Sequence, residues 1–329
     1  MEGGSARDRL EQALARIADP DGEGARTVLT VYADAAREAA DAADERAREG
    51  RALGPLDGAI VSIKDLFDVA GEPTRAGSLV LADAAPALTN APVVRRLREA
   101  GAVIVGKTNM SEFAFTGVGM NPHYGTPGNP ADRARVPGGS SSGAGVSVAD
   151  GMCEIAIGTD TGGSTRIPAA LCGVTGFKPT KSRVSTDGAY PLSPTLDSVG
   201  PLARSVEQCA KADPVLAGEA SWEIEPAQVR DLRIGILAGE PLTELDEIAA
   251  SRFEGAVTAL GRTGARLVDA PIPALEEMAR VNELTPSRPP RPIASTRHRS
   301  RRAGPTTINS SAAGSRAGGK RRTRSLPQC

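Results

Sequence analysis

Histidine, cysteine and aromatic residues are scarce in this sequence, and each scarcity excludes a class of protein. The 329 residues include only two histidines, His123 and His298, so a three-histidine zinc site and a two-histidine metalloprotease helix are excluded. The four cysteines form no CxxC pair and have no regular spacing, which is typical of a reduced cytoplasmic protein rather than of a disulfide framework. Only one Trp, three Tyr and five Phe are present, whereas 37 Gly and 25 Pro indicate a chain rich in turns and loops.

Long apolar segments are absent as well. No run of eighteen apolar residues occurs in the chain, and residues 1–16 are charged and lack the apolar stretch of a signal peptide. We therefore expect a cytoplasmic protein that neither spans a membrane nor is exported.

Acidic residues are missing from one end of the chain. The whole sequence is nearly neutral, with 39 Lys and Arg against 40 Asp and Glu, but no acidic residue follows Glu283. Residues 285–329 contain eleven basic residues and no aromatic one, and they consist mostly of Arg, Ser, Pro, Gly, Ala and Thr. A segment of this composition cannot form a packed core, so we expect a disordered basic tail.

Two explanations account for this tail. A shifted reading frame in a GC-rich gene produces arginine-rich sequence, and a basic arm for nucleic acid has the same charge. The lack of aromatic residues for base stacking, and of any recognisable nucleic-acid-binding fold, favours the first explanation. We therefore do not expect a nucleic-acid partner.

The rest of the chain alternates between helix-like and strand-like segments. Helices are predicted where apolar residues recur every three or four positions, and strands where short apolar runs occur. The predicted helices are 28–51, 92–100, 205–212 and 245–261, and the predicted strands are 58–63, 102–105, 154–157, 232–237 and 265–268. Such alternation favours an α/β fold with a mixed, largely parallel sheet and helices on both faces.

One motif in this pattern resembles a phosphate-binding loop. Residues 101–108 (GAVIVGKT) match the pattern GxxxxGK[ST], in which a strand precedes the first glycine and the next residues cradle the phosphates. Here the residues between the glycines are apolar and mostly β-branched. We therefore interpret the segment as a buried strand that ends near Lys107.

The strongest indication of a catalytic site comes from two Gly-Gly-Ser elements, at 138–140 and 162–164. Consecutive glycines before a serine allow positive φ and let successive N–H groups point to one side, as an oxyanion hole beside a nucleophile requires. Two flexible Gly/Ser loops are the alternative. The apolar strand between the elements, and Asp160, Arg166 and Pro168 around the second, favour the catalytic interpretation.

A serine nucleophile needs a base to accept its proton. His298 lies in the basic tail, and His123 lies in a loop where a surface turn residue is the simpler interpretation. Lys64 ends the apolar run GAIVSI, so the fold draws its ammonium group toward the interior. Burial lowers a lysine pKa by up to ~3 to 5 units, and a neutral lysine can act as a general base. An ion pair of Lys64 with Asp65 or Asp68 is the alternative.

Five ordered blocks resemble the amidase signature family of Ser-cisSer-Lys hydrolases. They are VSIKDLFDVAG (61–71), GKTNMSEFA (106–114), PGGSSSGAG through GTDTGGSTRIPA (137–169), GVTGFKPTKSRVS (173–185) and LDSVGPLARSV (196–206). The resemblance covers about 150 residues. It implies that Ser164 is the nucleophile, that Ser140 relays its proton after a cis peptide bond, and that Lys64 is the base.

The same resemblance implies the rest of the chemistry. The backbone amides of Thr161, Gly162, Gly163 and Ser164 would form the oxyanion hole. The reaction would be hydrolysis of a small-molecule carboxylic amide to a carboxylate and ammonia or an amine, through a serine acyl-enzyme. It needs no metal and no organic cofactor, and a homodimer is compatible with it.

Two alternative functions stay open. One is the glutaminase (A-type) subunit of a tRNA-dependent amidotransferase, which shares the signature and requires partner subunits. The other is an inactive amidase fragment with a basic nucleic-acid-binding tail, supported only by residues 285–329.

The sequence also departs from the family pattern. Thr165 stands where an apolar residue is usual, Ser142 where a glycine is common, and Ser182 where the family usually has glycine. The resemblance fades near residue 281, whereas family members continue for well over a hundred residues. We therefore expect a truncated or frame-shifted chain that is weakly active or inactive. It is expected to consist of an N-terminal helical segment (1–55), an incomplete amidase core (56–284) and the tail (285–329).

Overall fold

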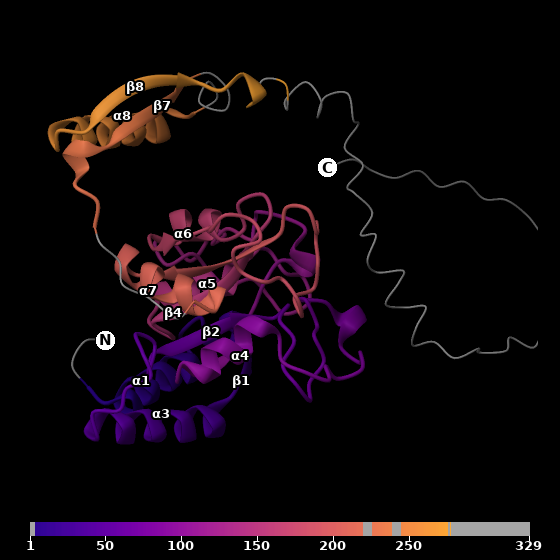
Figure 1. Ribbon diagram of the computed structural model, residues 1–329. Helices are drawn as coiled ribbons and strands as arrows, with labels where there is room; N and C mark the ends of the chain where they lie inside the picture. Colours follow the sequence, from indigo (N-terminus) through magenta and orange to yellow (C-terminus); the bar gives the residue numbers. More distant parts are fainter. Residues whose placement is uncertain (1–3, 220–225, 239–244, 276, 278–329) are drawn as a thin grey trace, which may run out of the picture. The chain divides into compact units, whose positions relative to one another are not determined.

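The computed structural model describes residues 4–219, 226–238, 245–275 and 277 (Figure 1). Its α-helices are α1 (Ala6–Ala18), α2 (Gly24–Thr27), α3 (Ala33–Arg48), α4 (Pro92–Glu99), α5 (Ser142–Ala149), α6 (Arg166–Cys172), α7 (Val206–Ala217) and α8 (Glu247–Arg262). Its strands are β1 (Val28–Val31), β2 (Ile60–Lys64), β3 (Val103–Thr108), β4 (Ile155–Asp160), β5 (Thr175–Gly176), β6 (Ser198–Ala203), β7 (Arg233–Ala238) and β8 (Arg266–Pro271). The basic tail, 285–329, lies outside the described residues.

Six strands form one mixed sheet in the order β1-β3-β2-β4-β6-β5. The central strands β3, β2 and β4 are parallel neighbours. Strands β1 and β6 pair antiparallel with β3 and β4, and β5 pairs antiparallel with β6. Four of the six strands therefore run in one direction, and the predicted α/β fold with a largely parallel sheet is confirmed.

Hydrophobic cores cover both faces of this sheet. Alternate residues of a strand point to opposite faces, and in β2 Val61 and Ile63 join the core formed with α4 and α7. Ile60 joins the other core, formed with α1, α3 and α5. Figure 1 shows α1 and α3 side by side, and their mutual packing belongs to this second core. Strands buried on both faces carry continuous apolar runs, which explains why β2, β3 and β4 are recognisable in the sequence.

The N-terminal helices are fixed to each other and to the sheet by polar contacts. Asp44 of α3 accepts hydrogen bonds from the backbone N–H groups of Ala6 (2.6 Å) and Arg7 (3.0 Å), the first residues of α1. Arg9 donates to Glu154 (2.8 Å), whose second oxygen accepts from Ile60 N (2.9 Å) at the start of β2. These bonds hold α1 against the strand that carries Lys64 at its other end.

One predicted helix is partly wrong. The segment 28–51 was expected to be helical throughout, but its first four residues form β1, which pairs with β3, and α3 begins only at Ala33. Val28, Leu29, Thr30 and Val31 suit a strand that can pair with β3, and this tertiary pairing decides their conformation. Residues 103–108 form the fully buried β3, so the strand interpretation of the phosphate-loop pattern is confirmed.

The segment from β7 to β8 is a separate strand-helix-strand element. Strands β7 and β8 are parallel and pair Arg233 with Arg266, and α8 begins at the N-cap Asp246, which accepts from Ala249 N (2.7 Å). The predicted elements at 232–237, 245–261 and 265–268 are confirmed with small shifts of their ends. None of the helices within the described ranges has the length and apolar character of a membrane span.

Candidate active site

The candidate site lies at the carboxyl ends of two neighbouring parallel strands. Lys64 is the last residue of β2 and Asp160 is the last residue of β4. Because parallel strands end at the same edge of a sheet, the segment that follows β4, which contains Ser164, lies at the edge where Lys64 ends. The Ser140 segment reaches the same edge because it immediately precedes α5, which packs on β2, β3 and β4.

Lys64 is completely buried among hydroxyl groups. Its Nζ lies 2.8 Å from Ser140 Oγ and 2.9 Å from Thr159 Oγ1, within hydrogen-bond distance of both. Burial lowers the pKa of Lys64 to about 7, although the charges of Asp160 and Asp197 oppose the change. A neutral amine is therefore accessible near neutral pH.

The alternative ion pair of Lys64 with a nearby aspartate is not formed within the described residues. Asp65 accepts instead from Gly77 N (3.1 Å), and Asp68 accepts from the Thr74 hydroxyl. The polar neighbours of Lys64 are hydroxyls rather than carboxylates, and a hydroxyl can give up a proton to an amine.

The peptide bond between Gly139 and Ser140 is cis, as the resemblance implies. The Ser140 carbonyl accepts from Ser111 N (3.0 Å), and Gly139 N donates to the Gly117 carbonyl (2.8 Å). A Cβ atom on residue 139 would lie only 2.7 Å from the backbone of Gly119, so only glycine fits there. This close backbone packing fixes Ser140 beside Lys64.

Asp160 organises the loop that carries Ser164. Its buried carboxylate accepts from the backbone N–H groups of Gly163 (2.8 Å), Thr165 (3.2 Å) and Arg166 (3.3 Å). The Arg166 guanidinium also donates two hydrogen bonds of 2.9 Å to it. Burial alone raises the pKa of Asp160, but these donors outweigh burial and hold the pKa below its usual value. The sequence placed Asp160 near the glycines but did not indicate this role.

Ser164 belongs to that loop and is 8% exposed. Its carbonyl accepts from Ser141 N (3.2 Å), which joins the two Gly-Gly-Ser elements. Within the described residues, no hydrogen bond connects Ser140 Oγ with Ser164 Oγ. The structure therefore brings Lys64 and Ser140 into direct contact and joins Ser164 to them through backbone.

The predicted oxyanion donors differ in their present contacts. The N–H of Gly163 donates to Asp160, whereas those of Thr161, Gly162 and Ser164 have no acceptor among the described residues. Residue 163 has φ +126°, which favours glycine, and a Cβ at residue 162 would meet no atom within 4 Å. Open space therefore lies beside Gly162.

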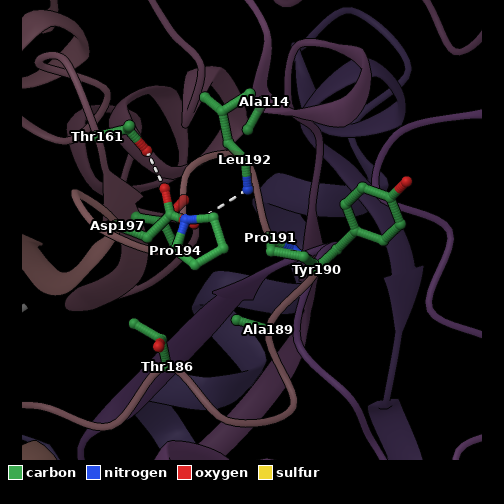
Figure 2. Close-up of a pocket in the computed structure, with 10 residues that line it drawn as sticks. Ala114, Thr161, Thr186, Ala189, Tyr190, Pro191, Leu192, Pro194 and Asp197 are labelled. Atoms are coloured by element: carbon green, nitrogen blue, oxygen red, sulfur yellow. Dashed lines mark hydrogen bonds between the residues drawn. The ribbon is translucent and has the colours of Figure 1, made fainter. Parts of the chain in front are cut away.

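A small pocket, with a cavity volume of about 50 Å³, adjoins this loop (Figure 2). Thr159 and Thr161 form one side of it, and Ala114 together with the segment 186–197 forms the rest. The Tyr190 ring packs on Phe113, with ring centroids 5.4 Å apart. Sequence reasoning missed Thr159 and Asp197 in this region, although both belong to the matched blocks.

His123 and the three departures from the family pattern all lie within the described residues. His123 is an exposed turn residue whose Nε2 lies 3.0 Å from Glu112, and within the described residues it makes no hydrogen bond to Lys64, Ser140 or Ser164. The three departures from the family pattern are each unfavourable locally. Ser142 and Thr165 have buried hydroxyls with no hydrogen-bond partner among the described residues, and Ser182 has φ +73°.

Comparison with known proteins identifies the family. The sequence matches the Amidase family over residues 8–287. The chain belongs to the amidase family. It is 44% identical over 249 residues to the AtzE subunit of 1-carboxybiuret hydrolase from Pseudomonas sp. (strain ADP), covering 71% of this chain and 54% of that protein.

Two further similar proteins are an amidotransferase subunit and a peptide amidase. The chain is 43% identical over 283 residues to the A-type subunit of glutamyl-tRNA(Gln) amidotransferase from Anaeromyxobacter dehalogenans (strain 2CP-C), covering 82% of this chain and 57% of that protein. The solved structure of peptide amidase from Stenotrophomonas maltophilia superposes with a TM-score of 0.74 at 36% identity, covering 84% of this chain and 61% of that one. This amidase chain thus spans little more than half the length of the curated relatives it matches.

Proposed function

We propose that the chain forms the catalytic core of an amidase that hydrolyses a small-molecule carboxylic amide to a carboxylate and ammonia or an amine. The observation that carries this proposal is the fully buried Lys64, 2.8 Å from Ser140 Oγ, at the sheet edge that also carries Ser164. A buried lysine whose pKa falls to about 7 can be a neutral base at physiological pH.

The reaction would proceed through an acyl-enzyme on Ser164. As Ser164 Oγ attacks the amide carbon, its proton passes to Ser140 Oγ while the Ser140 proton passes to Lys64 Nζ. When the tetrahedral intermediate collapses, the C–N bond breaks and the proton returns through Ser140 to the leaving amine. Water then attacks the ester carbon by the same relay, releasing the carboxylate and restoring Ser164.

Backbone amides would stabilise the negative charge on the substrate oxygen. The N–H groups of Thr161 and Gly162 have no acceptor in the described residues, and space is open beside Gly162. Gly163 N would join them only if it shared its bond to Asp160. Donors fixed before the reaction need no reorganisation as charge develops, which is why such a loop accelerates acyl transfer.

A fluorophosphonate probe tests the proposal directly. We expect labelling to map to the peptide that contains Ser164, and Ser164→Ala to abolish it together with amide hydrolysis. Ser185→Ala, a serine outside the site, is the matched control and should label normally. Labelling that survives Ser164→Ala unchanged would refute the assignment of the nucleophile.

One observation favours a second candidate, the glutaminase subunit of a tRNA-dependent amidotransferase. It is the 43% identity to a protein of that name, which extends over 283 residues. Under this candidate the substrate is glutamine and the chain needs partner subunits. Co-purification of such subunits with the chain from its own cell, together with glutamine hydrolysis, would distinguish this function from that of a free-standing amidase.

We also propose a cytoplasmic location and keep the predicted boundaries at residues 55 and 284. The three described cysteines, Cys153, Cys172 and Cys209, are buried and unpaired, which supports a reducing compartment. The first boundary separates a segment from the core it packs on, not two units that fold independently, because α1 and α3 share a hydrophobic core with the sheet. Residues 56–284 expressed alone should therefore not fold, and a stably folded product would show that the core is independent of residues 1–55.

A further inference from the structure

We infer that Asp197 is a positioning residue that holds the oxyanion loop and the wall of the adjoining pocket in one fixed arrangement. The oxyanion loop is residues 161–164, and the pocket wall is residues 190–197. The inference rests on the proposed function, because the loop matters only if Ser164 is acylated.

The position of Asp197 follows from the sheet. Strands β4 and β6 are antiparallel, and their last pair is Asp160 with Ser198. Thr161 and Asp197 are the next residues beyond that pair. The Thr161 hydroxyl donates to Asp197 Oδ1 at 2.5 Å, so a side-chain bond closes the ladder at the point where the oxyanion loop begins (Figure 2).

The same carboxylate also folds the pocket wall. Asp197 Oδ2 accepts from Leu192 N at 3.0 Å, and Ser193 N lies 3.0 Å from both carboxylate oxygens. Leu192 and Pro191 line the pocket with Thr161 (Figure 2). One carboxylate therefore joins the first residue of the loop to the surface that would contact the substrate.

Two carboxylates thus hold the oxyanion loop from different sides. Asp160 binds its later N–H groups, at Gly163 and beyond, whereas Asp197 binds the side chain of its first residue. The N–H groups of Thr161 and Gly162 lie between these two attachments and have no acceptor among the described residues. Their direction is therefore set by both aspartates.

Asp197 also contributes charge near the base. Asp160, after β4, and Asp197, before β6, both favour the charged form of Lys64. The charged groups on the neighbouring strands are engaged elsewhere, since Asp65, which follows β2, accepts from Gly77 and Lys107 of β3 pairs with Glu72. Neutralising Asp197 should therefore lower the pKa at which Lys64 becomes a base, in addition to loosening the loop.

The rate of fluorophosphonate labelling of Ser164, measured against pH, tests the inference. Asp197→Asn removes the charge and presents an amide N–H to the backbone donors of the wall, so labelling should slow about 10-fold or more and its pH midpoint should fall. Thr161→Val keeps the shape of the side chain and removes only the bond to Asp197. It should slow labelling about 3- to 10-fold without moving the midpoint.

Two matched variants serve as controls. Thr161→Ser retains the hydroxyl and should label faster than Thr161→Val, whereas Asp187→Asn removes an exposed charge from the same region without touching Thr161 and should label like the wild type. Thermal unfolding checks that each variant is folded, and Thr161→Val keeps the test decisive if Asp197→Asn does not fold. Wild-type rates and midpoints in Asp197→Asn or a wild-type rate in Thr161→Val would overturn the inference. Wild-type protein that is not labelled at Ser164 would instead overturn the proposed function, and this inference with it.

Discussion

Two regions of the molecule each bury a lysine at the end of a neighbouring parallel strand, and they differ in what surrounds the ammonium group. Lys64 ends β2 and faces the hydroxyls of Ser140 and Thr159. Lys107, 1% exposed in β3, lies 3.4 Å from the carboxylate of Glu72, which also accepts a hydrogen bond from Tyr32 (2.7 Å). The two buried ammonium groups therefore differ in their neighbours. Lys64 has hydroxyls with which it can exchange a proton, whereas Lys107 lies beside a carboxylate and its Nζ makes no hydrogen bond among the described residues.

The comparison also explains the phosphate-loop pattern around Lys107. In the phosphate-binding motif the lysine follows a loop that comes after the strand, but in this fold the lysine belongs to the strand itself. Its side chain is buried against Glu72 and cannot reach a bound phosphate. A phosphate-binding loop and this buried strand share the same sequence pattern. They differ in whether the strand lies before the first glycine or between the two glycines.

Replacing the two lysines should separate their roles most sharply. Lys64→Met should lower amide hydrolysis and Ser164 labelling by about 10²- to 10⁴-fold, because it removes the base of the relay. In the wild type, both rates should rise as pH increases through about 7, since the neutral amine is the reactive form. That rise should disappear in Lys64→Met. A variant that keeps the same pH profile would assign the titration to another group.

The pH dependence of stability provides a second way to test the comparison. The unfolded chain keeps the Lys64 proton up to about pH 10.5, whereas the folded chain releases it near 7. Between these pH values the unfolded state binds more protons than the folded state. The free energy of unfolding should therefore increase with pH, by roughly a few kcal/mol over this range. Urea denaturation across this range should show the increase in the wild type and a flatter dependence in Lys64→Met. Equal slopes in the two proteins would show that Lys64 is not the group responsible.

Lys107→Met should affect stability and leave the chemistry unchanged. Removing the cation leaves the partly buried Glu72 carboxylate without its ion-pair partner, which should cost about 1–3 kcal/mol in the free energy of unfolding. The pH midpoint of Ser164 labelling should stay at its wild-type value. A shifted midpoint would mean that the two regions are coupled and that the distinction between them is wrong.

The sequence reveals Lys64 much more readily than its surroundings. Lys64, Ser140 and Ser164 stand in recognisable motifs, and the apolar run before Lys64 predicts its burial. The bond between Thr161 and Asp197 joins residues 36 positions apart and depends on the register of β4 and β6. No local pattern encodes that register, so Asp197 could be placed only once the sheet was known.

The strands and helices also differ in how readily the local sequence reveals them. Strands β2, β3 and β4 are continuous apolar runs and were predicted, whereas β6 contains Gly200 and Pro201 and carries no strand pattern. Helix α5 was missed because its sequence, SGAGVSVA, is rich in small residues. In both cases burial between other elements, rather than local propensity, determines the conformation.

The smallest expected effect concerns a hydroxyl near the site that lacks a partner. In the part of the chain that the structure describes, Thr165 Oγ1 is buried without a hydrogen bond, in contrast to Ser140 and Thr159, whose hydroxyls contact Lys64. Thr165→Val replaces that hydroxyl with a methyl group of similar size and restores the apolar residue usual in the family. Since no bond is lost and a buried polar group is removed, stability should be unchanged or rise by up to about 1 kcal/mol. The pH midpoint of labelling should stay constant, because this hydroxyl does not contact Lys64. Urea denaturation checks the expected stability, and the pH profile of Ser164 labelling checks the midpoint. A decrease of more than about 1 kcal/mol in the free energy of unfolding would show that the Thr165 hydroxyl makes a stabilising hydrogen bond after all.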